Sequence, residues 1–71
     1  MNQNNLYLNN ILKNLNILYI EDEENIRVNI TKTLKILVNE VYDVETINDA
    51  NNFLEKERID IIISDINLGI D

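Results

Sequence analysis

Residues 59–65 read Ile-Asp-Ile-Ile-Ile-Ser-Asp, a short run of isoleucines that closes on a serine and a carboxylate. A β-branched run of this length predicts a strand rather than a helix. Its apolar residues do not alternate with polar ones, which indicates burial on both faces, as in a central strand of a parallel sheet. Open α/β sheets bind their ligands at the carboxyl ends of such strands. Asp65 stands at that end and is the first candidate site residue.

The segments before this strand alternate between strand and helix patterns. Residues 16–20 form another compact apolar run and predict the first strand. Residues 24–39 predict an amphipathic helix, whose inward face would carry Ile26, Ile30, Leu34 and Leu37. Residues 41–46 alternate as in a half-exposed edge strand. A second helix follows, for which we expect Asn48 or Asp49 as the N-cap and an inner face of Ala50, Phe53 and Leu54.

The chain therefore divides into two parts. Residues 1–14 form an N-terminal extension, in which apolar residues at helical spacing predict a short leading helix. Residues 15–71 have the order strand, helix, strand, helix, strand, which implies right-handed crossovers and a parallel sheet. We expect an α/β fold.

The composition excludes several classes of site. The chain has no cysteine and no histidine, so it lacks thiol chemistry and the commonest general base. Thirteen acidic and six basic residues give a net charge of −7, which repels nucleic acid and attracts cations and basic partners. No apolar run approaches the roughly 20 residues of a membrane span, and the polar start is no signal peptide. We expect a cytoplasmic protein that binds neither nucleic acid nor membranes.

Acidic side chains follow two of the predicted strands. Glu21 and Asp22 come directly after the first strand, and Asp65 ends the third. If those strands are parallel neighbours, the three carboxylates converge, and a hard cation, Mg²⁺ before Ca²⁺, would relieve their repulsion. A metal-bound aspartate could then attack a phosphoryl group. Ordinary structural roles remain open: acids favour the start of a helix, and an aspartate after a strand often caps a turn.

Two segments resemble the receiver domain of two-component response regulators. They are residues 17–24, Ile-Leu-Tyr-Ile-Glu-Asp-Glu-Glu, and residues 61–68, Ile-Ile-Ile-Ser-Asp-Ile-Asn-Leu, and their separation is typical of that family. The resemblance implies that Asp65 is the phosphoacceptor. It also implies that Mg²⁺ is held by Glu21, Asp22, Asp65 and the backbone carbonyl of Asn67. The implied fold is the flavodoxin-like receiver type, of which the chain holds the first three strands in the order 2-1-3.

The sequence departs from the receiver pattern chiefly by what these residues lack. Receivers have five strands, and the Ser or Thr that ends strand 4 and the Lys that ends strand 5 have no counterpart in residues 1–71. Lys56 precedes the phosphoacceptor and cannot be that lysine, and Gly69 stands where the family often has proline. We expect the N-terminal half of a receiver, truncated after the third strand, which would be poor at phosphorylation alone. Its third strand becomes an edge that pairs with a second copy or with the missing half.

Three functions follow from these residues. The leading expectation is a signalling module, not an enzyme, which accepts a phosphoryl group on Asp65 from a histidine kinase or phosphotransfer protein. The alternative is a truncated or degenerate receiver that binds partner proteins without phosphotransfer. A third is a small metal-dependent phosphohydrolase, which would need a second acid close after Asp65 that the sequence does not supply.

Overall fold

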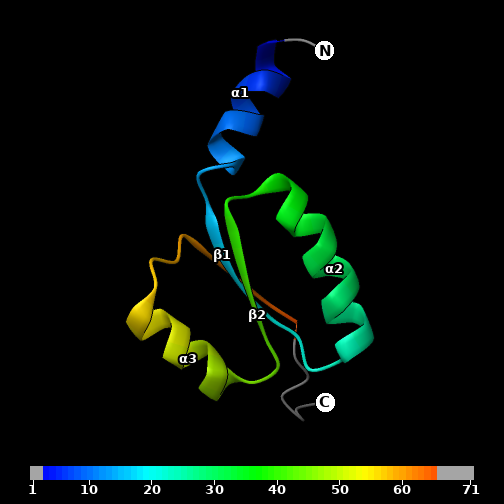
Figure 1. The fold of residues 1–71 in the computed structure, drawn as a ribbon, viewed down its shortest axis with the longest axis vertical. Helices are drawn as coiled ribbons and strands as arrows, with labels where there is room; N and C mark the ends of the chain where they lie inside the picture. Colours follow the sequence, from blue (N-terminus) through cyan, green and yellow to red (C-terminus); the bar gives the residue numbers. More distant parts are fainter. Residues whose placement is uncertain (1–2, 66–71) are drawn as a thin grey trace.

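The computed structural model describes residues 3–65. Asn67 and Gly69 therefore lie outside the described residues. Within them the leading helix precedes a strand, helix, strand, helix, strand order, as predicted (Figure 1). The elements are α1 (Gln3–Leu12), β1 (Asn16–Ile20), α2 (Glu24–Leu37), β2 (Glu40–Val44), α3 (Ile47–Lys56) and β3 (Ile61–Ser64).

The three strands form a parallel sheet in the order β2-β1-β3, which confirms the predicted order 2-1-3. β1 is the central strand, and all five of its residues are buried. This burial explains why residues 16–20 show no polar alternation, because a strand covered on both faces needs apolar side chains on both. β2 is an edge strand, as its alternation predicted.

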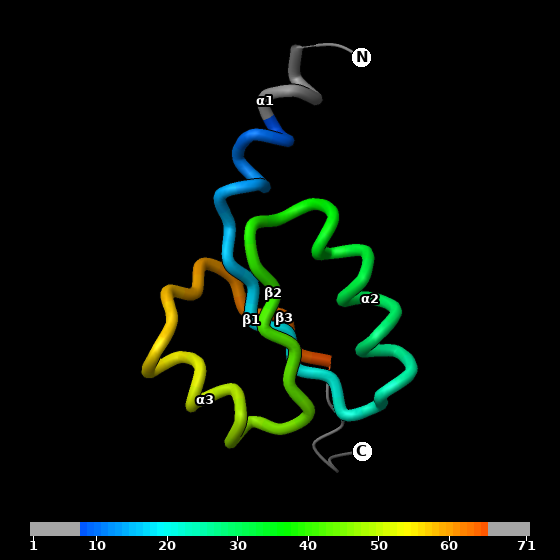
Figure 2. Tube along the Cα trace, in the orientation of Figure 1, coloured from blue at the N-terminus to red at the C-terminus, as the bar shows by residue number. Residues whose placement is uncertain are grey.

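The helices α2 and α3 cover opposite faces of the sheet, as Figures 1 and 2 show. On the α2 face, the core contains Ile17, Tyr19, Val38 and Val41, with Leu15 and Leu34 packed against it. On the α3 face, it contains Leu18, Ile20, Val44 and Ala50, with Tyr42, Phe53 and Ile59 packed against it. Alternate residues of β1 thus feed two separate cores.

The predicted burial of the isoleucine strand on both faces is wrong for this chain. Ile61, Ile62 and Ile63 are 37–52% exposed. β3 pairs with β1 on one side only, and the two helices pack over β1 and β2 rather than over β3. The expectation that this strand forms an edge of the sheet is confirmed. Residues 3–65 therefore cover the apolar side chains of β3 only in part.

The inward face of α2 also differs from the prediction. Leu34 packs against the core, but Ile26, Ile30 and Leu37 remain substantially exposed, and Thr31 is the buried residue of the helix. The physical reason is the position of α2 over β1 and β2, since residues 3–65 place no neighbouring helix along its outer side. The apolar spacing predicted the helix correctly, but the face of the helix that it predicted to be buried is not the face that is buried.

The start of α3 is capped by a residue that the pattern did not single out. Thr46 is the N-cap, and its side-chain oxygen accepts a 3.1 Å hydrogen bond from the Asp49 backbone N–H. The prediction of Asn48 or Asp49 as the cap is therefore wrong, because the helix begins two residues earlier. Ala50 is buried as expected and Phe53 stacks on Tyr42 with ring centroids 5.0 Å apart, whereas Leu54 is exposed.

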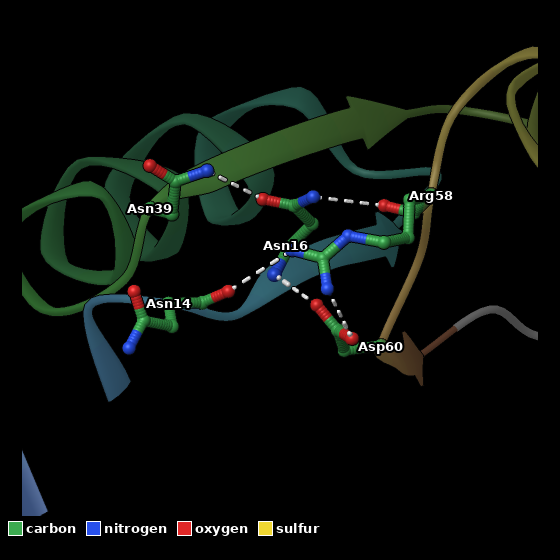
Figure 3. A network of polar contacts seen from close by, with 5 residues as sticks. All are labelled: Asn14, Asn16, Asn39, Arg58 and Asp60. Carbon is green, nitrogen blue, oxygen red and sulfur yellow. Dashed lines mark hydrogen bonds and ion pairs between the residues drawn. The ribbon is translucent and has the colours of Figure 1, made fainter. Parts of the chain in front are cut away.

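A polar network joins three loops at the amino edge of the sheet (Figure 3). The buried Asn16 side chain donates to the Arg58 carbonyl at 2.9 Å and accepts from the Asn39 amide at 2.7 Å. The Asn16 backbone N–H donates to the Asp60 carboxylate at 2.8 Å. The Arg58 guanidinium also donates to the Asn14 carbonyl at 3.2 Å. The network pins the junction of α1 and β1 to the loops beside it.

Each helix among residues 3–65 falls short of what a bilayer crossing requires in length and apolar character.

Candidate site at the carboxyl edge of the sheet

The carboxyl ends of β1 and β3 lie next to each other. Ile20 is paired with Ser64, and the next residue, Asp65, continues the ladder by donating its N–H to the Ile20 carbonyl at 2.8 Å. On the other side, the Glu21 N–H donates to the Val44 carbonyl of β2 at 3.0 Å. Glu21 and Asp65 therefore stand one register step beyond the paired strands, at the same edge. This is the edge where the parallel topology puts ligand sites.

The three carboxylates at this edge differ in their exposure. Glu21 is only 3% exposed, and one of its carboxylate oxygens accepts a 3.0 Å hydrogen bond from the Glu23 backbone N–H. Asp22 and Asp65 are both exposed. A buried, hydrogen-bonded glutamate is held in place, whereas the two aspartates remain open to solvent. Asp22 and Asp65 are accordingly the two carboxylates of this edge that a second molecule can reach.

The carboxylates influence one another electrostatically. The hydrogen bond from Glu23 favours the charged form of Glu21 and lowers its pKa. Burial, a hydrogen bond shared with Asp22 and the negative charges of Asp65 and Asp22 act in the opposite direction and together raise the pKa of Glu21 above its ordinary value. The edge is thus a place where negative charge accumulates at a free-energy cost, which a bound cation would offset.

Two of these carboxylates also raise the pKa of a buried tyrosine. Tyr19 is almost fully buried on the α2 face of β1. Burial, followed by the charges of Glu21 and Asp65, raises the pKa of its hydroxyl, while the nearby Arg27 acts in the opposite direction. Glu21 and Asp65, which follow different strands, therefore both raise the pKa of the same phenol. This agrees with the backbone register that brings Glu21 and Asp65 to one edge.

Arg27 is a site residue that the sequence pattern missed. It lies in the second turn of α2, and its guanidinium donates to the Glu21 carbonyl at 2.8 Å and pairs with the Asp43 carboxylate at 3.7 Å. Its side chain is largely buried. A signal was present, because Arg27 is the one basic residue among residues 21–31. It supplies positive charge to an edge that is otherwise acidic.

The donor set suits a hard divalent cation, which binds carboxylate oxygens. The structure brings Glu21, Asp22 and Asp65 to one edge, with Asp22 beside Glu21. Their side chains, as they stand, do not form a ready ligand set: within residues 3–65, no three acidic, histidine or cysteine side chains are grouped closely enough to hold a metal ion. Asn67, the further ligand that the resemblance implies, lies outside the described residues.

Searches for similar proteins found no matching family model, no matching curated protein and no matching solved structure. The functional inference therefore depends on the chemistry of this edge.

Proposed function

We propose that this chain is the N-terminal part of a receiver module that accepts a phosphoryl group on Asp65. The observation that carries the proposal is the 2.8 Å hydrogen bond from the Asp65 N–H to the Ile20 carbonyl. This hydrogen bond holds an exposed aspartate next to the end of β1, where the buried Glu21 follows. The parallel α/β sheet with strand order 2-1-3 supports a flavodoxin-like receiver type. The two acidic motifs of the sequence agree with that assignment.

The chemistry proposed for Asp65 is a simple displacement. One carboxylate oxygen of Asp65 forms a bond to phosphorus, while the bond between phosphorus and the histidine nitrogen of the donor protein breaks. The leaving imidazole keeps the electron pair of the broken bond, and the product is an acyl phosphate. The donor histidine lies outside residues 1–71, because this sequence contains none. Exposure of Asp65 allows such a partner to approach.

Mg²⁺ is the proposed cofactor, with Glu21, Asp22 and Asp65 as its protein ligands together with Asn67. When bound, it would supply positive charge to an edge where three carboxylates meet the incoming phosphoryl oxygens. Arg27 adds positive charge near this edge: it donates a hydrogen bond to the Glu21 carbonyl and forms an ion pair with Asp43. The protein itself therefore fixes the end of β1, orients Glu21 through the Glu23 N–H, and leaves Asp65 free to react.

An interaction module without phosphotransfer is the second candidate. The observation that favours it is the exposure of all three isoleucines of β3, which offers an apolar edge to another protein. In that case Asp65 would serve only to end the strand.

Binding of beryllofluoride, an acyl-phosphate analogue, separates the two candidates. We expect the wild-type chain to bind it weakly and only with Mg²⁺, because residues 1–71 lack the Ser or Thr and the Lys that hold the phosphoryl oxygens in receivers. A small fraction of the molecules should gain one phosphoryl group from acetyl phosphate, seen by mass spectrometry of the intact protein. Asp65→Asn should lose both. Asp49→Asn, an exposed aspartate after β2 rather than β3, should retain both. If wild type binds no beryllofluoride while far-ultraviolet circular dichroism reports a folded chain, phosphotransfer is rejected. If Asp65→Asn and wild type behave alike, Asp65 is not the acceptor.

A further inference from the structure

The helix α1 and the strand β3 both expose apolar side chains that no helix of residues 3–65 covers. Leu8 and Ile11 of α1 are 53% and 42% exposed, and α1 stands off the end of the sheet without packing on another helix or strand of residues 3–65 (Figure 1). Register places Ile61 and Ile63 of β3 on the α2 face, beside Ile17 and Tyr19 of β1. Within residues 3–65, no helix packs over that part of the α2 face.

The junction of α1 and β1 holds the helix away from its own sheet. Hydrogen bonds from Lys13, Asn14 and Leu15 to carbonyls of α1 continue the helical path up to β1. The Asn14 carbonyl is also held by the Arg58 guanidinium at 3.2 Å, at the amino edge of the sheet. The junction is thus fixed from both sides, and it directs α1 away from β3.

We propose that the α1 helix of one copy packs on the Ile61 and Ile63 face of β3 in a second copy, and the reverse, to form a two-fold symmetric homodimer. The inference is independent of phosphotransfer and holds whether or not Asp65 is an acceptor. Reciprocal docking of this kind gives a closed interface in which each copy contributes one helix and receives one.

Charge favours this partner. All thirteen acidic residues lie at position 21 or later, so the first 20 residues carry only the positive side chain of Lys13. The rest of the chain is strongly acidic and opposes self-association over most of its surface. The α1 segment is the part of the molecule that can approach a second acidic copy without repulsion. Lys13 adds attraction at the end of the helix.

Dimensions also agree. A ten-residue helix is about 15 Å long, and the ladder from Asp60 to Asp65 spans about 16–17 Å along the strand. Leu8 and Ile11 lie on one face of α1, about 5–6 Å apart. Ile61 and Ile63 are separated by about 6–7 Å on one face of β3. The two apolar pairs therefore have similar spacing.

Direct pairing of two β3 strands is the competing two-fold arrangement, and charge disfavours its register centred between Ile62 and Ile63. A symmetric antiparallel pairing centred between Ile62 and Ile63 would set Asp60 of each copy opposite Asp65 of the other. Like charges directly opposite across two strands are destabilising. Such pairing would also leave the Ile61 and Ile63 face uncovered.

Sedimentation equilibrium of the full 71-residue chain tests the proposal. We expect wild type to be a dimer and the double variant Leu8→Lys, Ile11→Lys to have the mass of a monomer. Because α1 packs on nothing in its own chain, that variant should keep the wild-type urea midpoint when both are measured under monomeric conditions. Ile36→Lys is the matched control: Ile36 is 75% exposed on α2, and its change to lysine should leave the dimer intact.

Cross-linking identifies the contact itself, since the chain has no native cysteine. An oxidised mixture of Ile11→Cys and Ile63→Cys chains should yield the mixed disulfide dimer, whereas Ile36→Cys with Ile63→Cys should not. A monomeric wild type overturns the proposal. So does a dimer that survives the double lysine variant, and a predominant disulfide between two Ile63→Cys chains would identify strand pairing instead.

Discussion

The Asn16 backbone N–H donates a 2.8 Å hydrogen bond to the carboxylate of Asp60 and thereby ties the start of β1 to the start of β3. The Asp60 N–H in turn donates to the Asn16 carbonyl at 2.9 Å. At the other end of the strand, the Asp65 N–H donates to the Ile20 carbonyl. An edge strand that no helix covers within residues 3–65 is thus held to β1 along its whole length. The site at the carboxyl edge depends on that register.

Removal of the Asp60 acceptor should weaken the fold. Asp60→Ala leaves the Asn16 N–H without its charged partner and should lower the free energy of unfolding by about 1.5–3 kcal/mol. Asp60→Asn keeps an oxygen acceptor and loses mainly the exposed ion pair with Arg58, which is worth about 0–1 kcal/mol. Urea unfolding measures both. Equal losses in the two variants would show that charge rather than the hydrogen bond matters.

Thr46 and Asn48 can be compared as rival caps of α3. Thr46→Ala removes the oxygen that accepts the Asp49 N–H and should lower the free energy of unfolding by about 1 kcal/mol. Asn48→Ala replaces an exposed residue inside the helix and should change it by less than about 0.5 kcal/mol. Thermal or urea unfolding followed by circular dichroism distinguishes them. A larger loss for Asn48→Ala would contradict the helix start at Ile47.

The buried hydroxyl of Thr31 finds no hydrogen-bond partner among residues 3–65. An unpaired buried hydroxyl is destabilising, so Thr31→Val, which keeps the shape, should raise the free energy of unfolding by about 1 kcal/mol. Thr33→Val is the control on the same helix, because Thr33 is exposed and should change little. A loss of stability in Thr31→Val would mean that the hydroxyl has a partner outside the described residues.

The raised pKa of Glu21 gives the stability a defined pH dependence. A carboxyl whose pKa is higher in the folded than in the unfolded state stabilises the fold fully below its ordinary value of 4.5, and this contribution is lost as the pH rises through the folded pKa. Urea unfolding in chelator, from about pH 4 to pH 7, should show the decline. Glu21→Gln should flatten it. Should Glu21→Gln instead be less stable at every pH, the Glu23 hydrogen bond to the charged carboxylate outweighs the surrounding repulsion.

Local sequence determined the elements and their order. The apolar run of residues 16–20 and the helical spacing after it are short-range patterns, so they identified β1 and α2 almost to the residue. Alternation of strands and helices predicted a parallel sheet with right-handed crossovers, and the resemblance to receiver domains implied the order 2-1-3. If the first and third strands were neighbours, as they are, that topology predicted Glu21 and Asp65 at one edge of the sheet.

Tertiary structure alone decided which apolar residues are covered and which polar ones are buried. The isoleucines of β3 have the sequence of a central strand but lie half exposed, because burial depends on neighbouring elements that a residue's own periodicity does not encode. The same holds for Thr31, buried in place of Ile26 on α2, and for Arg27, whose partners Glu21 and Asp43 belong to other segments. Contacts between distant segments arise only when the strands are side by side, and they determine how the carboxyl edge is built.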